Sequence, residues 1–294
     1  MNTILSTLRS NTIQKLQKTR SNRPVVIYRS RQENIEIESV TPQPFDGFDF
    51  SYVKDPISEI RKCKGILIKQ KIESPEFITG FETCNKYYIF GIGERGYKFL
   101  FKCEEYTNCF NKFFCPTALK EIKMKLLHIS PSNSSFSSTN ISNIIKPFKC
   151  SCFCIGRPEI ILTLNDSNEI IGKIREPFSC CDYCYEIINK QNQIKYIIKG
   201  NYCQCGLFCS NSICGKRCEA NFSILNPKTG EQVGSIEKLL EDKTKEEENY
   251  QINFPPKANS NDKLLLTVLG LMIDYQFFEI DPLKLKDTIN KNLS

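Results

Sequence analysis

The chain contains repeated pairs of short apolar runs, and each pair is separated by residues that favour turns. β-Branched and aromatic residues dominate the runs, whereas Gly, Asn, Asp, Ser or Pro occupy the connections. Paired runs of this kind predict β-hairpins. Regularly spaced hairpins predict a mainly β protein, either an antiparallel barrel or a sandwich. The pairs are Tyr87–Phe90 with Tyr97–Phe101, Glu159–Leu164 with Glu169–Ile174, Tyr185–Ile188 with Ile194–Lys199, and Asn221–Leu225 with Gln232–Ile236.

The strongest helical pattern lies near the end of the chain, at Lys263–Glu279. Asn261 or Asp262 is the expected N-cap, and Pro282 follows the helix. A helix of this length spans about 26 Å, and its apolar stretch is shorter than the roughly 20 residues that cross a bilayer. Because the segment is apolar on all sides, we expect it to be buried in the core rather than inserted in a membrane. A barrel wrapped around this helix would satisfy both patterns.

The remaining segments set the expected domain limits. Residues 1–55 form a basic, proline-containing leader, residues 56–281 a single domain, and residues 282–294 a tail. The Ser/Asn-rich segment His128–Asn143 is expected to be a surface loop within the domain. Seven basic residues and no acid precede Glu33. The leader therefore either meets anionic lipid or nucleic acid, or is a solvated chain end.

The composition, with 40% hydrophobic and 25% charged residues, is that of an ordinary soluble globular protein. The moderate net charge of +7 predicts no specific nucleic-acid partner. The N-terminal segment lacks the continuous apolar stretch of a signal peptide, so we expect no signal peptide and a reducing, cytosolic location.

Few residues suggest catalysis. His128 is the single histidine, and its neighbours Leu126, Leu127 and Ile129 offer no catalytic partner, so we expect either a structural imidazole with satisfied hydrogen bonds or an exposed one. The sequence also lacks the motifs of a phosphate-binding loop, a serine-hydrolase elbow and a zinc protease. We therefore expect no enzyme and no catalytic residues.

Sixteen cysteines in a chain with a reducing location leave three interpretations. The thiols carry lipid, bind zinc, or are small apolar residues of the core. Spacing alone does not decide between these alternatives. Spacings close to those of tetrahedral zinc sites occur at Cys180 with Cys184 and in the run Cys203, Cys205, Cys209, Cys214 and Cys218.

Five blocks, taken in chain order, carry a family resemblance: Ile78–Tyr87 (ITGFETCNKY), Cys150–Cys154 (CSCFC), Gly200–Cys209 (GNYCQCGLFC), Glu246–Pro255 (EEENYQINFP) and Ile273–Glu279 (IDYQFFE). They resemble, respectively, the TGFE segment, the palmitoylated cysteine cluster, the second thiol-rich turn, the proposed calcium segment and the C-terminal IDFMFFE segment of the phospholipid scramblase family. The resemblance covers about residues 56–281. Order and spacing, more than any one block, make the chain similar to this family.

The resemblance implies a tubby-like closed antiparallel β-barrel wrapped around one buried hydrophobic C-terminal helix. It also implies ATP-independent, calcium-regulated movement of phospholipids between membrane leaflets, which makes membrane phospholipids the partners. Two acyl chains anchor a protein stably, so lipidation would hold the chain at the cytoplasmic face of the plasma membrane or of an endomembrane. The implied palmitoylation sites are Cys150, Cys152 and Cys154.

The same resemblance places a calcium site at Glu246, Glu248 and the backbone carbonyls of Tyr250 and Ile252. Calcium takes about six to eight oxygen ligands. Lys257 stands where the family carries a closing acid, which removes one ligand, and Asp262 is the nearby substitute. We therefore expect any calcium to bind weakly. The alternative is an acidic loop that leads into the helix.

Two other functions remain open at this stage. One is a tubby-like module that binds phosphoinositide or a protein partner without moving lipid, because a fold does not fix a function. The other is a cytosolic interaction domain that is stabilised by zinc.

Overall fold

The computed structural model describes most of the second half of the chain and much of the first. Its described residues are 51–71, 85–93, 96–106, 121–131, 136–149, 156–180, 182–202, 204, 220–239 and 249–277. The leader expected at residues 1–55 lies outside them up to residue 50, and the tail expected at residues 282–294 lies wholly outside them.

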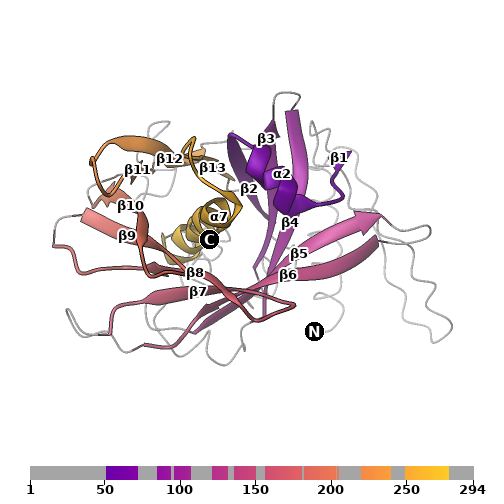
Figure 1. The fold of residues 1–294 in the computed structure, drawn as a ribbon, viewed down its shortest axis with the longest axis horizontal. Helices are drawn as coiled ribbons and strands as arrows, with labels where there is room; N and C mark the ends of the chain where they lie inside the picture. Colours follow the sequence, from indigo (N-terminus) through magenta and orange to yellow (C-terminus); the bar gives the residue numbers. More distant parts are fainter. Residues whose placement is uncertain are drawn as a thin grey trace, which may run out of the picture. The chain divides into compact units, whose positions relative to one another are not determined.

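Thirteen described strands form one sheet, which closes on itself because β4 pairs with both β3 and β5. Neighbouring strands from β2 to β13 are antiparallel, and β1 adds a short parallel pairing to β4. Figure 1 shows the strands surrounding helix α7. The predicted closed antiparallel barrel is confirmed. The strands are β1 (Ser51–Tyr52), β2 (Gly65–Lys71), β3 (Lys86–Gly93), β4 (Gly96–Glu105), β5 (Ile122–Pro131), β6 (Phe136–Lys146), β7 (Glu159–Leu164), β8 (Ile170–Arg175), β9 (Asp182–Asn189), β10 (Ile194–Asn201), β11 (Asn221–Leu225), β12 (Gln232–Leu239) and β13 (Asn249–Asn253).

All four predicted hairpins are present, as β3–β4, β7–β8, β9–β10 and β11–β12. In the three of these hairpins whose turns the structure describes completely, the turn formers expected from the sequence connect the strands. Asn192, in the β9–β10 turn, has φ 59°, a conformation that Asn tolerates better than most residues. The carboxamide of Asn189 closes the same turn, since its Oδ1 accepts from the main-chain N–H groups of Gln191 (3.0 Å) and Gln193 (2.9 Å). Local chemistry therefore fixes the connection.

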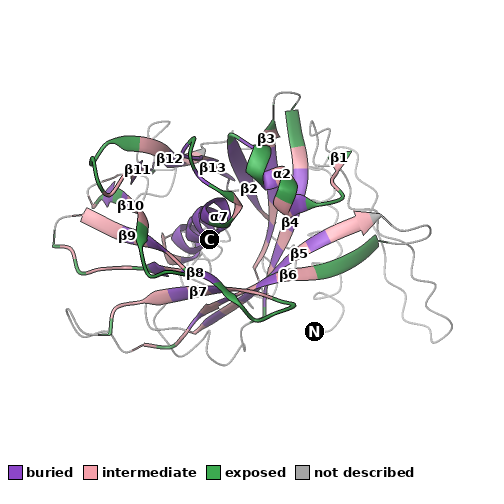
Figure 2. Cartoon of the chain, in the orientation of Figure 1, coloured by how far each residue is buried: buried purple, intermediate pink, exposed green. Residues whose placement is uncertain are grey.

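The prediction of a surface loop at His128–Asn143 is wrong. Most of this segment belongs to β5 and β6, which pair from Ile122 opposite Lys146 to Pro131 opposite Phe136. Ser137, Ser138 and Thr139 at the start of β6 are exposed, so their polarity suits a solvent-facing strand (Figure 2). Composition concealed the strand because the alternating buried positions of β6, Ser142, Ile144 and Lys146, are mostly polar residues.

Helix α7 (Ser260–Phe277) fills the interior of the barrel, and its residues from Asp262 to Tyr275 are buried (Figure 2). It contacts β2, β8, β9 and β13. Gly270 allows a close approach to the wall, because a Cβ there would lie 2.7 Å from Cδ1 of Ile252 and 3.1 Å from Cδ1 of Ile68. The prediction of a buried core helix is confirmed.

The start of α7 differs from the prediction. Asn259, rather than Asn261 or Asp262, caps the helix: its Oδ1 accepts from the N–H of Asp262 (2.9 Å). Asp262 reciprocates, because its Oδ2 accepts from the N–H of Asn259 (3.2 Å). This is a capping box, in which two side chains satisfy the free N–H groups of the first turn. The helix consequently begins at Ser260, earlier than expected.

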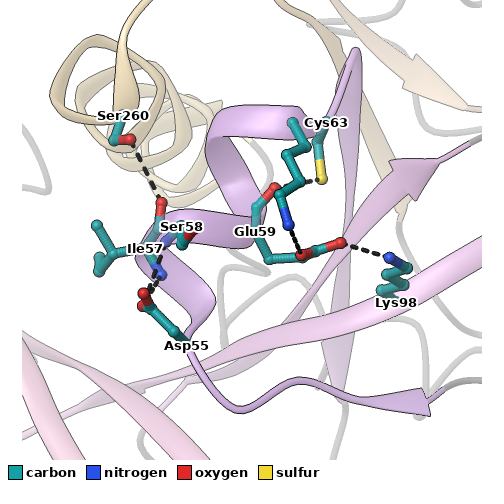
Figure 3. Close-up of polar contacts among 8 residues, drawn as sticks. Asp55, Ile57, Ser58, Glu59, Cys63, Lys98 and Ser260 are labelled. Carbon is teal, nitrogen blue, oxygen red and sulfur yellow. Dashed lines mark hydrogen bonds and ion pairs between the residues drawn. The ribbon is translucent and has the colours of Figure 1, made fainter.

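A short helix, α2 (Pro56–Lys62), packs against the first half of α7. Asp55 caps it by accepting from the N–H groups of Ile57 (3.1 Å) and Ser58 (3.2 Å), as Figure 3 shows. Ser260 of α7 donates to the carbonyl of Ile57 over 3.3 Å (Figure 3). These contacts tie the two helices together.

The other end of α2 is closed by a buried lysine. Nζ of Lys263 donates to the carbonyls of Arg61 (2.7 Å), Cys63 (2.8 Å) and Ile60 (3.3 Å). A cation at the C-terminus of a helix is also favoured by the helix dipole. Lys263 therefore fixes the first turn of α7 to α2.

Candidate functional site

A cavity of about 80 Å³ lies beside the last turns of α7, between this helix and the ends of several strands. Most of its lining is apolar, and charged groups occupy part of the wall. We take it as the candidate site because small-molecule sites combine an apolar concave surface with a few polar groups. Its lining residues are Ile122, Lys146, Arg157, Pro158, Ile160, Ile174, Glu176, Tyr185, Met272, Tyr275 and Gln276.

The charged wall of the cavity is an ion pair between the two ends of the β7–β8 hairpin. Nη2 of Arg157 lies 2.6 Å from Oε1 of Glu176, and Nε of Arg157 donates to the carbonyl of Glu176 over 3.1 Å. Burial raises the pKa of the Glu176 carboxyl, although Arg157 and Lys146 oppose the shift. The site therefore holds cationic and anionic groups in a partly desolvated, otherwise apolar setting.

The last turn of α7 is joined to the barrel wall at the same cavity. The phenol of Tyr185 in β9 donates to Oε1 of Gln276 over 3.0 Å. Burial raises the pKa of Tyr185 well above its ordinary value, and the charge of Glu176 adds to the shift. The position of this turn therefore depends on groups that line the cavity.

A second polar network lies in the interior, between β3, β4 and α7. Tyr87 donates to Oδ2 of Asp274 (2.8 Å), and Tyr275 donates to Oε1 of Glu105 (3.4 Å). Oε2 of Glu105 accepts from the N–H of Asn85 (3.2 Å). Asn85 and Tyr87 belong to the first resemblance block, whereas Asp274 and Tyr275 belong to the last. The fold therefore brings the two blocks together.

The expected calcium segment is only partly described. Tyr250 and Ile252 lie in β13, with buried side chains, and β13 is hydrogen-bonded to β12 on one side and to β2 on the other. Their carbonyls therefore belong to a central strand of the barrel. Glu246 and Glu248 lie outside the described residues, and the calcium site stays a prediction.

Lys257 and Asp262, which follow the calcium segment in the chain, both lie within the described residues. Lys257 is exposed in the turn between β13 and α7. Asp262, the expected substitute ligand, is buried and accepts a main-chain hydrogen bond in the capping box of α7. Its carboxylate is used to start the helix.

Most of the cysteines singled out from the sequence lie outside the described residues. These are Cys150, Cys152 and Cys154 of the acylation cluster, and Cys203, Cys205, Cys209, Cys214 and Cys218 of the zinc alternative. Cys180 is exposed and Cys184 is half-buried. Within the described part of the chain, no group of three or more His, Cys, Asp or Glu side chains is placed to hold a metal ion.

Two other thiols and the histidine belong to the barrel itself. Cys63 and Cys103 are buried and free, and burial raises the pKa of both thiols. They act as small apolar residues, one of the interpretations that the sequence left open. His128 is buried in β5, but neither ring nitrogen has a hydrogen-bond partner among the described residues, so it is not the satisfied imidazole that was expected. Among the helices that the structure describes, none is both long and apolar enough to cross a membrane.

The charged residues of the cavity were not found from the sequence. A signal was present, since Arg157 and Glu176 are oppositely charged, lie just outside the two ends of a predicted hairpin, and each precede a proline. Antiparallel pairing brings such flanking residues together. Lys146 gave no comparable signal because the strand that ends with it was not predicted.

Comparison with known proteins identifies the family. A family model described as Scramblase matches residues 51–280, from β1 past the end of α7. The chain belongs to the Scramblase family. This confirms the resemblance, and the match begins five residues before the expected domain start, where β1 already pairs with β4.

Individual scramblases are similar at about one residue in four. Human phospholipid scramblase 1 is 26% identical over 220 residues, which cover 73% of this chain and 63% of that protein. Human phospholipid scramblase family member 5 is 25% identical over 223 residues, or 73% of each chain. Mouse phospholipid scramblase 1 is also 25% identical, over 61% of its length. The match thus spans less than two thirds of the two scramblase 1 proteins. No solved structure matches.

Proposed function

We propose that this chain moves phospholipids in both directions between the leaflets of a membrane, without ATP and under calcium control. The observation that supports the proposal most is the extent of the family match, which covers the barrel from β1 past the end of α7. The similar human and mouse proteins carry phospholipid scramblase names. The proposed substrates are therefore membrane phospholipids, and the proposed action is transport rather than catalysis.

The packing of the barrel bears on the route of the lipid. Helix α7 occupies the interior, with its residues from Asp262 to Tyr275 buried. The cavity beside it, at about 80 Å³, is roughly the volume of three water molecules in the liquid and far smaller than a phospholipid. We therefore assign lipid movement to the surface between the domain and the membrane, and not to the barrel interior.

Calcium control is proposed to act through Glu246 and Glu248, which precede β13 in the chain. β13 leads to α7 through a short turn, in which the N–H of Phe254 donates to the carbonyl of Lys64 over 2.9 Å. An ion held by the two carboxylates would therefore lie close in sequence to the strand that positions α7. Because the proposed ligand set contains only two carboxylates, the proposed affinity is weak.

Membrane attachment is proposed to use acyl chains on Cys150, Cys152 and Cys154. This cluster follows Lys149 directly in the chain. Two or more acyl chains give stable attachment, whereas one gives marginal binding. The proposed location is the cytoplasmic face of the plasma membrane or of an endomembrane.

Transport is tested with purified full-length protein in vesicles that contain a fluorescent phospholipid. Dithionite, added outside, bleaches only the outer leaflet, so bleaching of the inner-leaflet lipid reports scrambling. The assay is run without ATP, with calcium or with a chelator, and with protein-free vesicles as the control. Bleaching beyond the outer-leaflet fraction in calcium supports the proposal.

Two alternatives predict other outcomes. Headgroup-selective binding to liposomes without bleaching of the inner leaflet would support a barrel that binds lipid or protein and transports nothing. Near-stoichiometric zinc in the purified protein, held against mild chelation, would support a zinc-stabilised interaction domain built on Cys203, Cys205, Cys209, Cys214 and Cys218.

A further inference from the structure

Two phenylalanine side chains stand out on the described surface. Phe148 is 57% exposed and Phe178 is 54% exposed, more than any other large apolar residue in the described part of the chain. Exposure of one such side chain is ordinary. Two of them in neighbouring segments are what an interaction surface would present.

The two phenylalanines lie at the same end of the barrel. Phe148 lies shortly after the end of β6 at Lys146, and Phe178 shortly after the end of β8 at Arg175. The residues just before β7 connect the two segments. Nζ of Lys149 donates to the carbonyl of Arg157 (3.5 Å), and the N–H of Glu176 donates to the carbonyl of Pro158 (3.1 Å). We call the segments 146–149, 156–159 and 173–179 the docking end.

The charge of the docking end is positive. Its two acids are already used, since Glu159 lies near Lys149 (3.7 Å) and Lys173 (3.9 Å), while Glu176 pairs with Arg157 (2.6 Å). The cations outnumber these carboxylates. They are Lys146, which is buried, Lys149, Arg157, Lys173, and Arg175, which is paired with Glu186 at 2.6 Å.

We propose that the docking end binds the surface of an anionic phospholipid bilayer, with Phe148 and Phe178 entering the interface. The transfer of an aromatic side chain from water to the boundary between headgroups and acyl chains lowers the free energy. Nearby cations add attraction to anionic lipid. The choice of a membrane as the partner rests on the proposed function. The choice of this end of the barrel rests on the exposed rings and the surrounding cations.

The chain supplies a matched control at the opposite end of the same strands. Ile170 is 41% exposed at the start of β8, and Ile194 is 38% exposed at the start of β10. The two turns at that end are joined by Lys190 and Glu169, 3.1 Å apart. Replacing these isoleucines removes exposed apolar surface without touching the docking end.

The test is flotation of unacylated full-length protein with vesicles of phosphatidylcholine and phosphatidylserine. Since burying a phenylalanine side chain is worth about one factor of ten or more in binding, the double variant F148S/F178S should bind at least about tenfold more weakly than the wild type. The variant I170S/I194S should bind as the wild type does. Thermal unfolding of both variants shows whether the barrel is intact, as expected for exposed positions.

Three results would overturn the assignment: equal binding by F148S/F178S, equal loss in I170S/I194S, or wild-type binding to pure phosphatidylcholine that matches binding to the anionic mixture. The transport assay separates this inference from the proposed function. Vesicle binding that depends on the two phenylalanines, without bleaching of inner-leaflet lipid, would retain the docking end and reject transport. Transport by the wild type, together with unchanged vesicle binding by F148S/F178S, would retain the proposed transport function and reject the docking end.

Discussion

The phenol of Tyr87 donates a hydrogen bond to Oδ2 of Asp274 over 2.8 Å, inside the barrel and across 187 positions of sequence. Tyr87 closes the first block that resembles the scramblases, and Asp274 lies in the last. A tyrosine on β3 and an aspartate on α7 therefore hold the helix in register with the wall. This contact gives the two blocks a structural role that they share.

Substituting phenylalanine for Tyr87 should destabilise the barrel. The variant Y87F keeps the ring but removes the donor to a buried carboxylate, which should cost about 1–3 kcal/mol of unfolding free energy. Urea unfolding followed by circular dichroism measures the change. The matched variant Y106F removes a phenol that is 40% exposed, and it should change stability by less than about 0.5 kcal/mol. Equal stability of Y87F and the wild type would show that the contact contributes nothing.

Stability should fall in alkaline solution. Burial raises the pKa of Tyr87 and Tyr185 well above the ordinary value of 10.0, and raises that of Tyr196 to about 12. Burial also raises the pKa of the Cys103 thiol from its ordinary 9.0. The unfolded chain then loses protons that the folded chain keeps, so stability decreases as pH rises through these ordinary values. Lys263, whose pKa is lowered by burial, opposes the trend as a single group.

Urea unfolding between about pH 8 and about pH 11, together with phenolate absorbance, checks this expectation. The buried phenols should ionise only when the chain unfolds. Full ionisation of the tyrosines near their ordinary pKa in a protein that is still folded would contradict the burial of these three side chains.

The ion pair at the cavity should be worth more than a pair on the outer surface. R157M leaves the mostly buried carboxylate of Glu176 without its partner, and should cost about 1–3 kcal/mol of unfolding free energy, less than for a fully buried pair. The double variant R157M/E176M should recover part of that loss. Lys190 and Glu169, 3.1 Å apart with both side chains more than half exposed, supply the control, and K190M should cost less than about 1 kcal/mol. Equal costs at the two pairs would remove the distinction between them.

Calcium dependence should disappear when the two proposed ligands are neutralised. E246Q/E248Q should scramble at the same rate with calcium and with a chelator, because two charged ligands are lost. D166N/E231Q, which changes the same number of charges at exposed turn positions, should respond to calcium as the wild type does. A full calcium response by E246Q/E248Q would place the calcium site elsewhere.

The elements with strong local signals could be predicted from the sequence. The β9–β10 hairpin was found because β-branched and aromatic runs flank Asn189–Gln193, and these turn residues also hydrogen-bond locally in the structure. The buried helix was found because Leu264–Ile273 is apolar on every side and too short to span a bilayer. Both inferences depend on contacts between near neighbours in the chain.

Other features depend on tertiary context that the pattern does not show. The strand β6 was missed because Ser137, Ser138 and Thr139, near its start, are polar residues on an exposed face. The start of α7 was misplaced because Asn259 and Asp262 form the capping box, although that pair was readable in the sequence. The ion pair of Arg157 and Glu176 requires the hairpin to be closed before the two residues meet.

Dithionite bleaching of fluorescent phospholipid in vesicles that contain the full-length protein tests the central claim most directly. The account predicts bleaching of inner-leaflet lipid in calcium and without ATP, and slower bleaching in a chelator. A plateau at the outer-leaflet fraction in every condition, from protein shown to be folded and bound to the vesicles, would contradict it.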